Sequence, residues 1–201
     1  LALITGAPAT VIMTSFAVPL TSLVYGTQEA ASLLKVLAPF FLLLYFQGPL
    51  QAALQGLDLA KTAMLNTLYG AVIKMGAILL LASRPELGIF GAALAININI
   101  CLVTLLHFFS VVKAINRLSI PIIDLGKVGL AMVIMTVGGR QAYQWAGENF
   151  PFSPSSTLLL AIALALFLYL CALLALKMIG QQDIERIPFI GKRLAPYFPK
   201  R

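Results

Sequence analysis

A charge-free apolar run from Leu158 to Leu176 constrains this sequence more than any other feature. A helix needs about 20 apolar residues to cross the roughly 30 Å hydrocarbon core of a bilayer, and this run nearly reaches that length alone. The remainder has the same character: of 201 residues, 60% are hydrophobic and 10% are charged, whereas soluble domains carry about 25% charged residues. The composition excludes a water-soluble globule and a disordered chain, and it predicts a polytopic membrane protein.

Charged residues divide the sequence into six apolar segments, each long enough for one helix. We predict an all-α fold, a bundle of six transmembrane helices over residues 1–180, followed by a basic tail over residues 181–201. The expected spans cover residues 1–25, 33–57, 62–82, 87–112, 122–145 and 157–179. Prolines interrupt the first two spans, and proline kinks a membrane helix or marks an unwound stretch.

Basic residues are distributed unequally between the two sets of connections. One set carries three, which are Lys35, Arg84 and Arg140. The other set, with the tail, carries ten, which are Lys61, Lys113, Arg117, Lys127, Lys177, Arg186, Lys192, Arg193, Lys200 and Arg201. Because basic residues of short loops stay in the cytoplasm, we expect the tail there, anchored on anionic headgroups. The net charge of +7 then reflects loop bias, and we expect no nucleic-acid partner.

Lys74 belongs to neither set, because it lies near the centre of the third expected span. A lysine at a helix centre costs about 2.5–3.5 kcal/mol on insertion scales. All seven acidic residues lie in loops, the tail or span ends, so none is an obvious partner. The sequence leaves three interpretations: a missing part of the protein supplies an acid, an anionic substrate is the partner, or Lys74 only faces water in a groove.

Two stripes of polar and small residues occupy consecutive expected spans at helical spacing. They consist of Gln47, Gln51 and Gln55 in the second span and of Asn66, Gly70 and Lys74 in the third. A short turn joins the two spans, so we expect the stripes to face one another. They serve either as interhelical hydrogen bonds, each worth about 0.6 kcal/mol on average, or as the lining of a polar cavity.

The fourth and fifth spans add four polar residues of interest. Asn97 and Asn99 are two positions apart and point to different faces, so we expect at least one to hydrogen-bond a neighbouring helix. We interpret His107 as a packing or headgroup contact and regard a proton relay as the weaker alternative. Arg140 lies near the outer interface and is a candidate contact to an anionic substrate. The candidate cavity-lining residues are therefore Lys74, Asn66, Gln47, Gln51, Gln55, Asn97 and Arg140.

Signatures of catalysis are missing from the sequence. It has no glycine-rich phosphate loop and no His-Glu-x-x-His motif, and it has one histidine. Cys101 and Cys171 lie in apolar runs and are expected to be small packing residues. We therefore expect no enzyme, no catalytic residue, no metal ligand and no cofactor.

Four segments, taken in order, resemble one family of membrane exporters. They are GAPATVIMTSFAVPLTSLVYG from Gly6, LQGLDLAKTAMLNTLYGAVIKMGAILLL from Leu54, LGIFGAALAININI from Leu87 and DIERIPFIGKRL from Asp183. The sequence resembles the polysaccharide flippase or stage V sporulation protein B-like family of the multidrug/oligosaccharidyl-lipid/polysaccharide exporter superfamily. The resemblance spans nearly the whole chain.

The resemblance implies a flippase that moves an undecaprenyl-linked polysaccharide or peptidoglycan precursor across the bacterial cytoplasmic membrane by alternating access. Such flippases have two lobes around a cavity, and this chain corresponds to their C-terminal part. The expected partners are a lipid-linked oligosaccharide or lipid II-like substrate, the lipid bilayer and the missing N-terminal lobe, in cis or in trans. Lys74 is then a candidate cation for the lipid pyrophosphate.

Two alternatives to this function stay open. One is a cation-coupled multidrug antiporter of the same superfamily, although such extruders favour acids in the cavity and the span centres here have none. The other is a non-transporting membrane scaffold or an inactive fragment.

Overall fold

The computed structural model describes residues 2–116, 122–151 and 153–178, which form seven α-helices and no strand. The helices are α1 (Ala2–Ser15), α2 (Ala17–Tyr25), α3 (Glu29–Gly56), α4 (Ala60–Ala82), α5 (Ile89–Ile115), α6 (Ile122–Asn149) and α7 (Pro154–Ala175). They belong to two compact units, residues 1–120 and residues 121–201, and each unit is described by itself.

Within the part of the chain that the structure describes, four helices, α3, α4, α5 and α7, are long and apolar enough to cross a membrane, and the bent pair α1–α2 adds a fifth span if it counts as one. Many of their large apolar side chains are exposed, and Leu79 and Leu80 are 73% and 70% exposed. Soluble monomers rarely expose contiguous apolar surface on this scale. The protein is therefore a multi-pass helical membrane protein, as the composition predicts.

Helix α6 forms one helix over the range of the expected fifth span. Its first half is mainly apolar and carries two charged residues, Asp124 and Lys127. Its second half is more polar, because Arg140, Gln141 and Gln144 follow one another within two turns after Gly138. The number of six crossings stays a prediction.

The expected first span is two helices that meet at an angle of 78°. Pro19 lies four residues after Ser15 and has no N–H to donate to the Ser15 carbonyl, and its ring crowds that carbonyl. The bend falls at Phe16, between the two helices. Gly26, with a φ of 70°, then ends α2 in the left-handed conformation that glycine adopts without strain.

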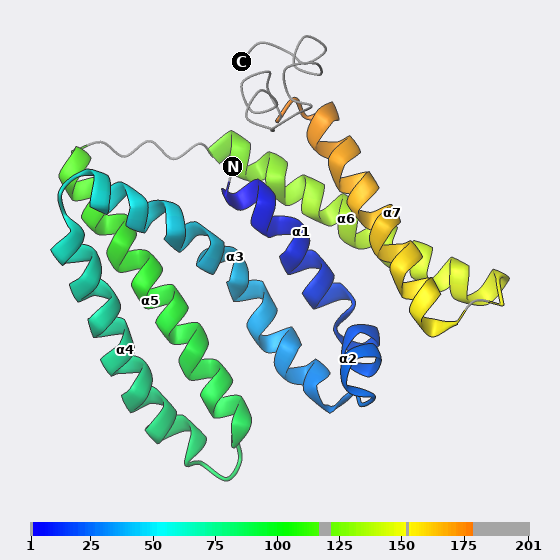
Figure 1. Cartoon of the computed structure of the whole chain (residues 1–201), viewed down its shortest axis with the longest axis horizontal. Coiled ribbons are helices and arrows are strands. Elements are labelled where there is room, and N and C mark those ends of the chain that lie inside the picture. Colours follow the sequence, from blue (N-terminus) through cyan, green and yellow to red (C-terminus); the bar gives the residue numbers. More distant parts are fainter. Residues whose placement is uncertain (1, 117–121, 152, 179–201) are drawn as a thin grey trace. The chain divides into compact units, whose positions relative to one another are not determined.

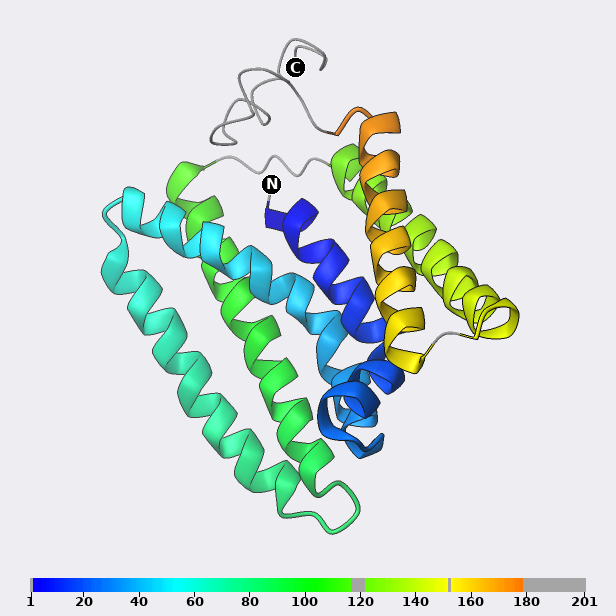
Figure 2. The same ribbon diagram turned by 45° about the vertical axis from the view of Figure 1, so that its right-hand side comes forward.

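In the first unit, α5 packs against both α3 and α4, and α3 also packs against α1 and α2 (Figures 1 and 2). Small residues set these close approaches. A Cβ atom on Gly91 would collide with the backbone carbonyl of Leu81, and a Cβ atom on Gly6 would lie 2.6 Å from the Tyr45 ring. The α4–α5 hairpin therefore depends on a residue without a side chain at its tip.

The second unit is the α6–α7 pair. Ser153 caps α7 by accepting a hydrogen bond from the Ser156 N–H, and Pro154 occupies the first turn, where its missing donor costs nothing. The buried face of α7 includes Ala161 and Ala165 at helical spacing. A Cβ atom on Gly138 of α6 would collide with Leu168 of α7, so small residues again permit the contact.

The bounds of the remaining helices lie within a few residues of the expected spans. The predicted tail, residues 181–201, lies outside the described residues. Because the two units are described separately, a single bundle over residues 1–180 also stays a prediction.

Candidate functional site

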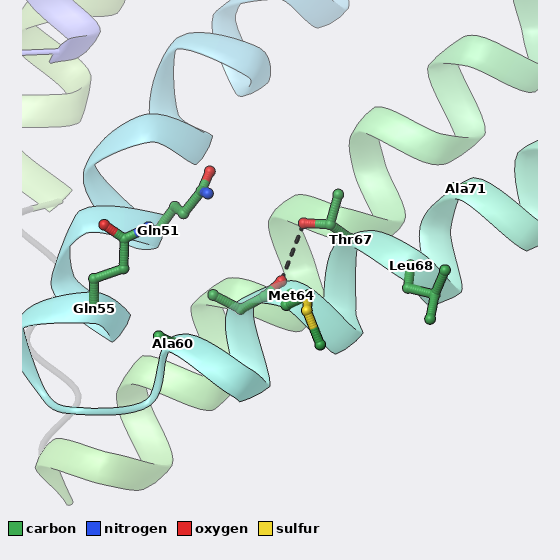
Figure 3. Close-up of a pocket in the computed structure, with 8 residues that line it drawn as sticks. Gln51, Gln55, Ala60, Met64, Thr67, Leu68 and Ala71 are labelled. Carbon is green, nitrogen blue, oxygen red and sulfur yellow. Dashed lines mark hydrogen bonds between the residues drawn. The ribbon is translucent and has the colours of Figure 1, made fainter.

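An open groove runs between α3 and α4 near the short connection that joins them. It has a volume of about 460 Å³. Figure 3 shows Gln51 and Gln55 on α3 and, across the gap, Met64, Thr67 and Leu68 on α4. The Thr67 hydroxyl donates to the Ala63 carbonyl, so this wall of the groove is mainly apolar. We call this feature the α3–α4 groove.

The groove adjoins a smaller and more polar cavity of about 160 Å³, which we call the polar hollow. Gln51, Thr67 and Ala71 line both spaces, so the two are adjacent. The other residues that line the hollow are Gln47, Lys74, Asn99, Val103 and His107. Pockets for drug-sized ligands measure about 300–1,000 Å³. The hollow therefore suits a headgroup-sized polar molecule, and the groove extends it toward a longer one.

Gln47 forms an interhelical link between α3 and α5. Its Nε2 donates to the Ile100 carbonyl and to the Thr104 hydroxyl, both at 2.9 Å. Thr104 in turn donates to the Ile100 carbonyl at 2.6 Å. This residue thus performs both roles that the sequence allowed for the glutamines, because it joins two helices and also lines the hollow.

The other two glutamines lie differently. Gln51 and Gln55 are exposed and form no hydrogen bond within the described part of the chain. Gln51 lines both spaces, and Gln55 lines the groove. Their amide groups are therefore available to a ligand.

The expected stripe on α4 does not face the groove as a unit. Asn66 is buried and donates to the Ser110 hydroxyl of α5 at 3.1 Å. Gly70 also faces α5, where a Cβ atom would lie 2.7 Å from Asn99 Oδ1. At 3.6 residues per turn, eight positions advance about 80° around the helix. Lys74 has consequently turned away from Asn66 and lies with Thr67 and Ala71 at the hollow.

Lys74 is partly buried, and its ammonium group has no hydrogen bond or ion pair among the residues that the structure describes. Among the described residues, no Asp or Glu lines the hollow or the groove. Neutral amides surround the cation instead, because Gln47, Gln51 and Asn99 share its cavity. An ammonium group in such a setting is suited to bind an anion.

Asn97 and Arg140 lie away from this hollow. Asn97 is 3% exposed, and its Nδ2 donates to the Val36 carbonyl of α3 at 2.9 Å. This confirms the expectation that at least one asparagine of this pair bonds a neighbouring helix. Arg140 is exposed on α6 of the second unit. Its role as a substrate contact stays a prediction.

Sequence reasoning did not place His107, Asn99 and Thr67 in a candidate site. His107 is 1% exposed, so it packs inside the protein, which agrees with the packing interpretation and not with a headgroup contact. The available signal was the spacing of Asn99, Val103 and His107, which follow one another at four-residue intervals along one face of α5.

The fold and site define a multi-pass helical membrane protein with an uncompensated cation in a polar hollow. Over 195 residues, or 96% of its length, the chain is 43% identical to stage V sporulation protein B of Bacillus subtilis (strain 168) and covers 36% of that protein. It is also 34% identical over 111 residues, 55% of its length, to sporulation protein YkvU of the same organism, of which it covers 25%.

The chain thus spans about a third or less of the length of these curated relatives. The similarity supports a stage V sporulation protein B-like family for this chain. No family profile and no solved structure matches the chain significantly.

Proposed function

We propose that the chain is part of a membrane flippase that moves an undecaprenyl-linked polysaccharide or peptidoglycan precursor across the cytoplasmic membrane by alternating access. The observation that carries this proposal is the unpaired Lys74 ammonium in the polar hollow, which lies beside the α3–α4 groove. The hollow fits the phosphate part of such a substrate, and the mainly apolar wall of the groove fits the adjoining lipid chain.

The similarity to stage V sporulation protein B supports the same proposal. The names of both relatives refer to sporulation, and we propose that setting for this chain. In this proposal the chain is the C-terminal part of a two-lobed exporter of the multidrug/oligosaccharidyl-lipid/polysaccharide superfamily. It crosses the membrane six times with its tail in the cytoplasm, and an N-terminal lobe completes the cavity in cis or in trans.

The charge of the cavity argues against the two alternatives. A multidrug antiporter for cationic compounds needs acidic groups, and the described part of the chain contributes no acidic residue to the lining of the hollow or the groove. A scaffold has no use for a cation that costs about 2.5–3.5 kcal/mol to bury in a membrane helix. We therefore propose a transporter of anions and not an enzyme.

The test measures flipping of a fluorescent lipid II analogue in proteoliposomes that contain the protein as it occurs in its own membrane. Removing one charged hydrogen-bond donor costs about 1.5–3 kcal/mol, so Lys74→Gln is expected to reduce substrate affinity roughly tenfold to a hundredfold. Lys74→Glu is expected to abolish flipping, and Lys74→Arg to retain most of it.

The matched control is Lys61→Gln, which removes an exposed charge from the first turn of the same helix, outside the lining of both spaces. It is expected to flip like the wild type. Full activity of Lys74→Glu would contradict the proposed role of the hollow. An intact mass well above 21.6 kDa for the native polypeptide would place the missing lobe in cis.

A further inference from the structure

The ring of His107 lies at the wall of the polar hollow in a fixed orientation. Its Nδ1 lies 2.8 Å from the Val103 carbonyl, one turn earlier on α5. A carbonyl oxygen only accepts hydrogen bonds, so Nδ1 carries the hydrogen. In the neutral ring, Nε2 is then an unprotonated acceptor, and no group among the described residues bonds to it.

Nε2 is open to the hollow rather than sealed in the protein. Among the described residues, two side-chain atoms are fully buried without a hydrogen-bond partner, Ser15 Oγ and Asn97 Oδ1. His107 Nε2 also lacks a partner but is not one of them, so it keeps some accessible area. His107 is nevertheless almost entirely buried and lines the hollow, so its small accessible area faces that space. A proton that reaches Nε2 converts this atom from an acceptor into a charged donor directed at the hollow.

The groups around the ring determine when that proton binds. From α4, Lys74 lines the hollow with His107, and from α3 the neutral amides of Gln47 and Gln51 do so. The charged side chains of α3, Glu29 and Lys35, do not line it. An oxyanion in the hollow can accept hydrogen bonds from both the Lys74 ammonium and a protonated ring.

We propose that the polar hollow binds a phosphate-class oxyanion together with one proton on His107 Nε2. Lys74 supplies the permanent charge, the protonated ring supplies the second charged donor, and the Gln51 amide supplies a neutral one. The proton comes from solvent and forms an N–H bond at Nε2, and no other covalent bond changes. The inference rests on the proposed function, in which this same hollow takes the phosphate part of the substrate.

Coupling of this kind is reciprocal. If the anion raises the affinity of His107 for a proton, the proton raises the affinity of the hollow for the anion by the same factor. Histidine ordinarily changes its charge between pH 5 and 8. Anion affinity should therefore fall as the pH rises through the range in which the ring loses its proton, and the total fall should equal that factor.

His107 is the one histidine of this chain, so its imidazole gives unambiguous nuclear magnetic resonance signals after ¹⁵N-histidine labelling. The probe is sulfate, because it does not titrate in this pH range and any proton taken up belongs to the protein. The 201-residue chain is titrated with acid in nanodiscs, with and without sulfate. We expect sulfate to move the titration midpoint of the ring upward by one pH unit or more.

Two variants separate the ring from the cation. His107→Asn keeps an amide donor for the Val103 carbonyl and lacks Nε2, so its sulfate affinity should be weaker and independent of pH. Lys74→Gln should abolish the sulfate-dependent movement of the midpoint. Lys113→Gln is the control on the same helix, since Lys113 is exposed and does not line the hollow.

The outcomes distinguish this inference from the proposed function. Sulfate binding that depends on Lys74 but leaves the His107 midpoint unchanged overturns the proton linkage and leaves the anion site intact. Absence of any Lys74-dependent binding overturns both. Repeating the titration with undecaprenyl phosphate identifies the source of the anion: a larger movement at equal concentration supports a lipid headgroup, and an equal movement supports a free oxyanion.

Discussion

Replacing Gln47 with methionine keeps the length of the side chain and removes the amide that joins α3 to α5. Two interhelical hydrogen bonds disappear, one to the Ile100 carbonyl and one to the Thr104 hydroxyl. Such bonds average about 0.6 kcal/mol in membranes, with a maximum of about 1.7, so the pair contributes about 1.2 kcal/mol. Thr104 still donates to the Ile100 carbonyl, so the substitution leaves that carbonyl with a partner. The unfolding constant should therefore rise about sevenfold.

The assay is reversible unfolding of the chain by sodium dodecyl sulfate in mixed micelles, followed by circular dichroism. Gln51→Met is the matched control, because Gln51 lies one turn later on the same helix and forms no hydrogen bond within the described residues. It is expected to change the free energy of unfolding by less than about 0.5 kcal/mol. If both substitutions destabilise the chain equally, the hydrogen bonds of Gln47 do not join the two helices as argued.

Two further predictions concern packing and helix geometry. Gly70→Ala should destabilise the chain by about 1–3 kcal/mol in the same assay, because its Cβ atom would collide with α5 side chains. Gly76→Ala, which meets open space on the same helix, should instead stabilise it by up to about 1 kcal/mol. Pro19→Ala should relax the bend of 78° between α1 and α2. The distance between spin labels at Thr5 and Leu23, in a chain without its native cysteines, measures this change. It should increase from roughly 21 Å toward the 27 Å or so of a straight helix. An unchanged distance would show that packing, and not proline, holds the bend.

The sequence predicted most helix ends well where charged residues separate the apolar runs, but proline was a poorer guide, because α3 continues through Pro39 and Pro49. Residues 62–82 and 87–112 correspond closely to α4 and α5. The pairing of faces was harder to predict. Two stripes joined by a short turn were expected to meet, but α5 takes the contact of Asn66 and Gly70 instead. Which helix contacts α4 depends on which of the 15 glycines permits a close approach. The sequence does not show whether a glycine packs against a neighbouring side chain or faces open space.

The candidate site was predicted in part for a related reason. Lys74 was easy to recognise, because placing a charge in an apolar membrane helix costs free energy whatever surrounds it. His107 was not conspicuous, because a histidine near the end of an apolar run is compatible with several environments. Its place in the hollow follows from the packing of α5 between α3 and α4, which the order of residues along one helix does not reveal.

Gln47 both joins α3 to α5 and lines the hollow, and these two roles limit which residues can replace it. In a deep mutational scan, position 47 should tolerate few substitutions, because a replacement must satisfy both the helix contact and the chemistry of the hollow. Gln51 is constrained only by its place at the hollow and the groove, and Gln55 only by its place at the groove. Variants at position 47 should thus lose abundance and activity together, whereas variants at position 51 should lose activity while the protein remains abundant in the membrane.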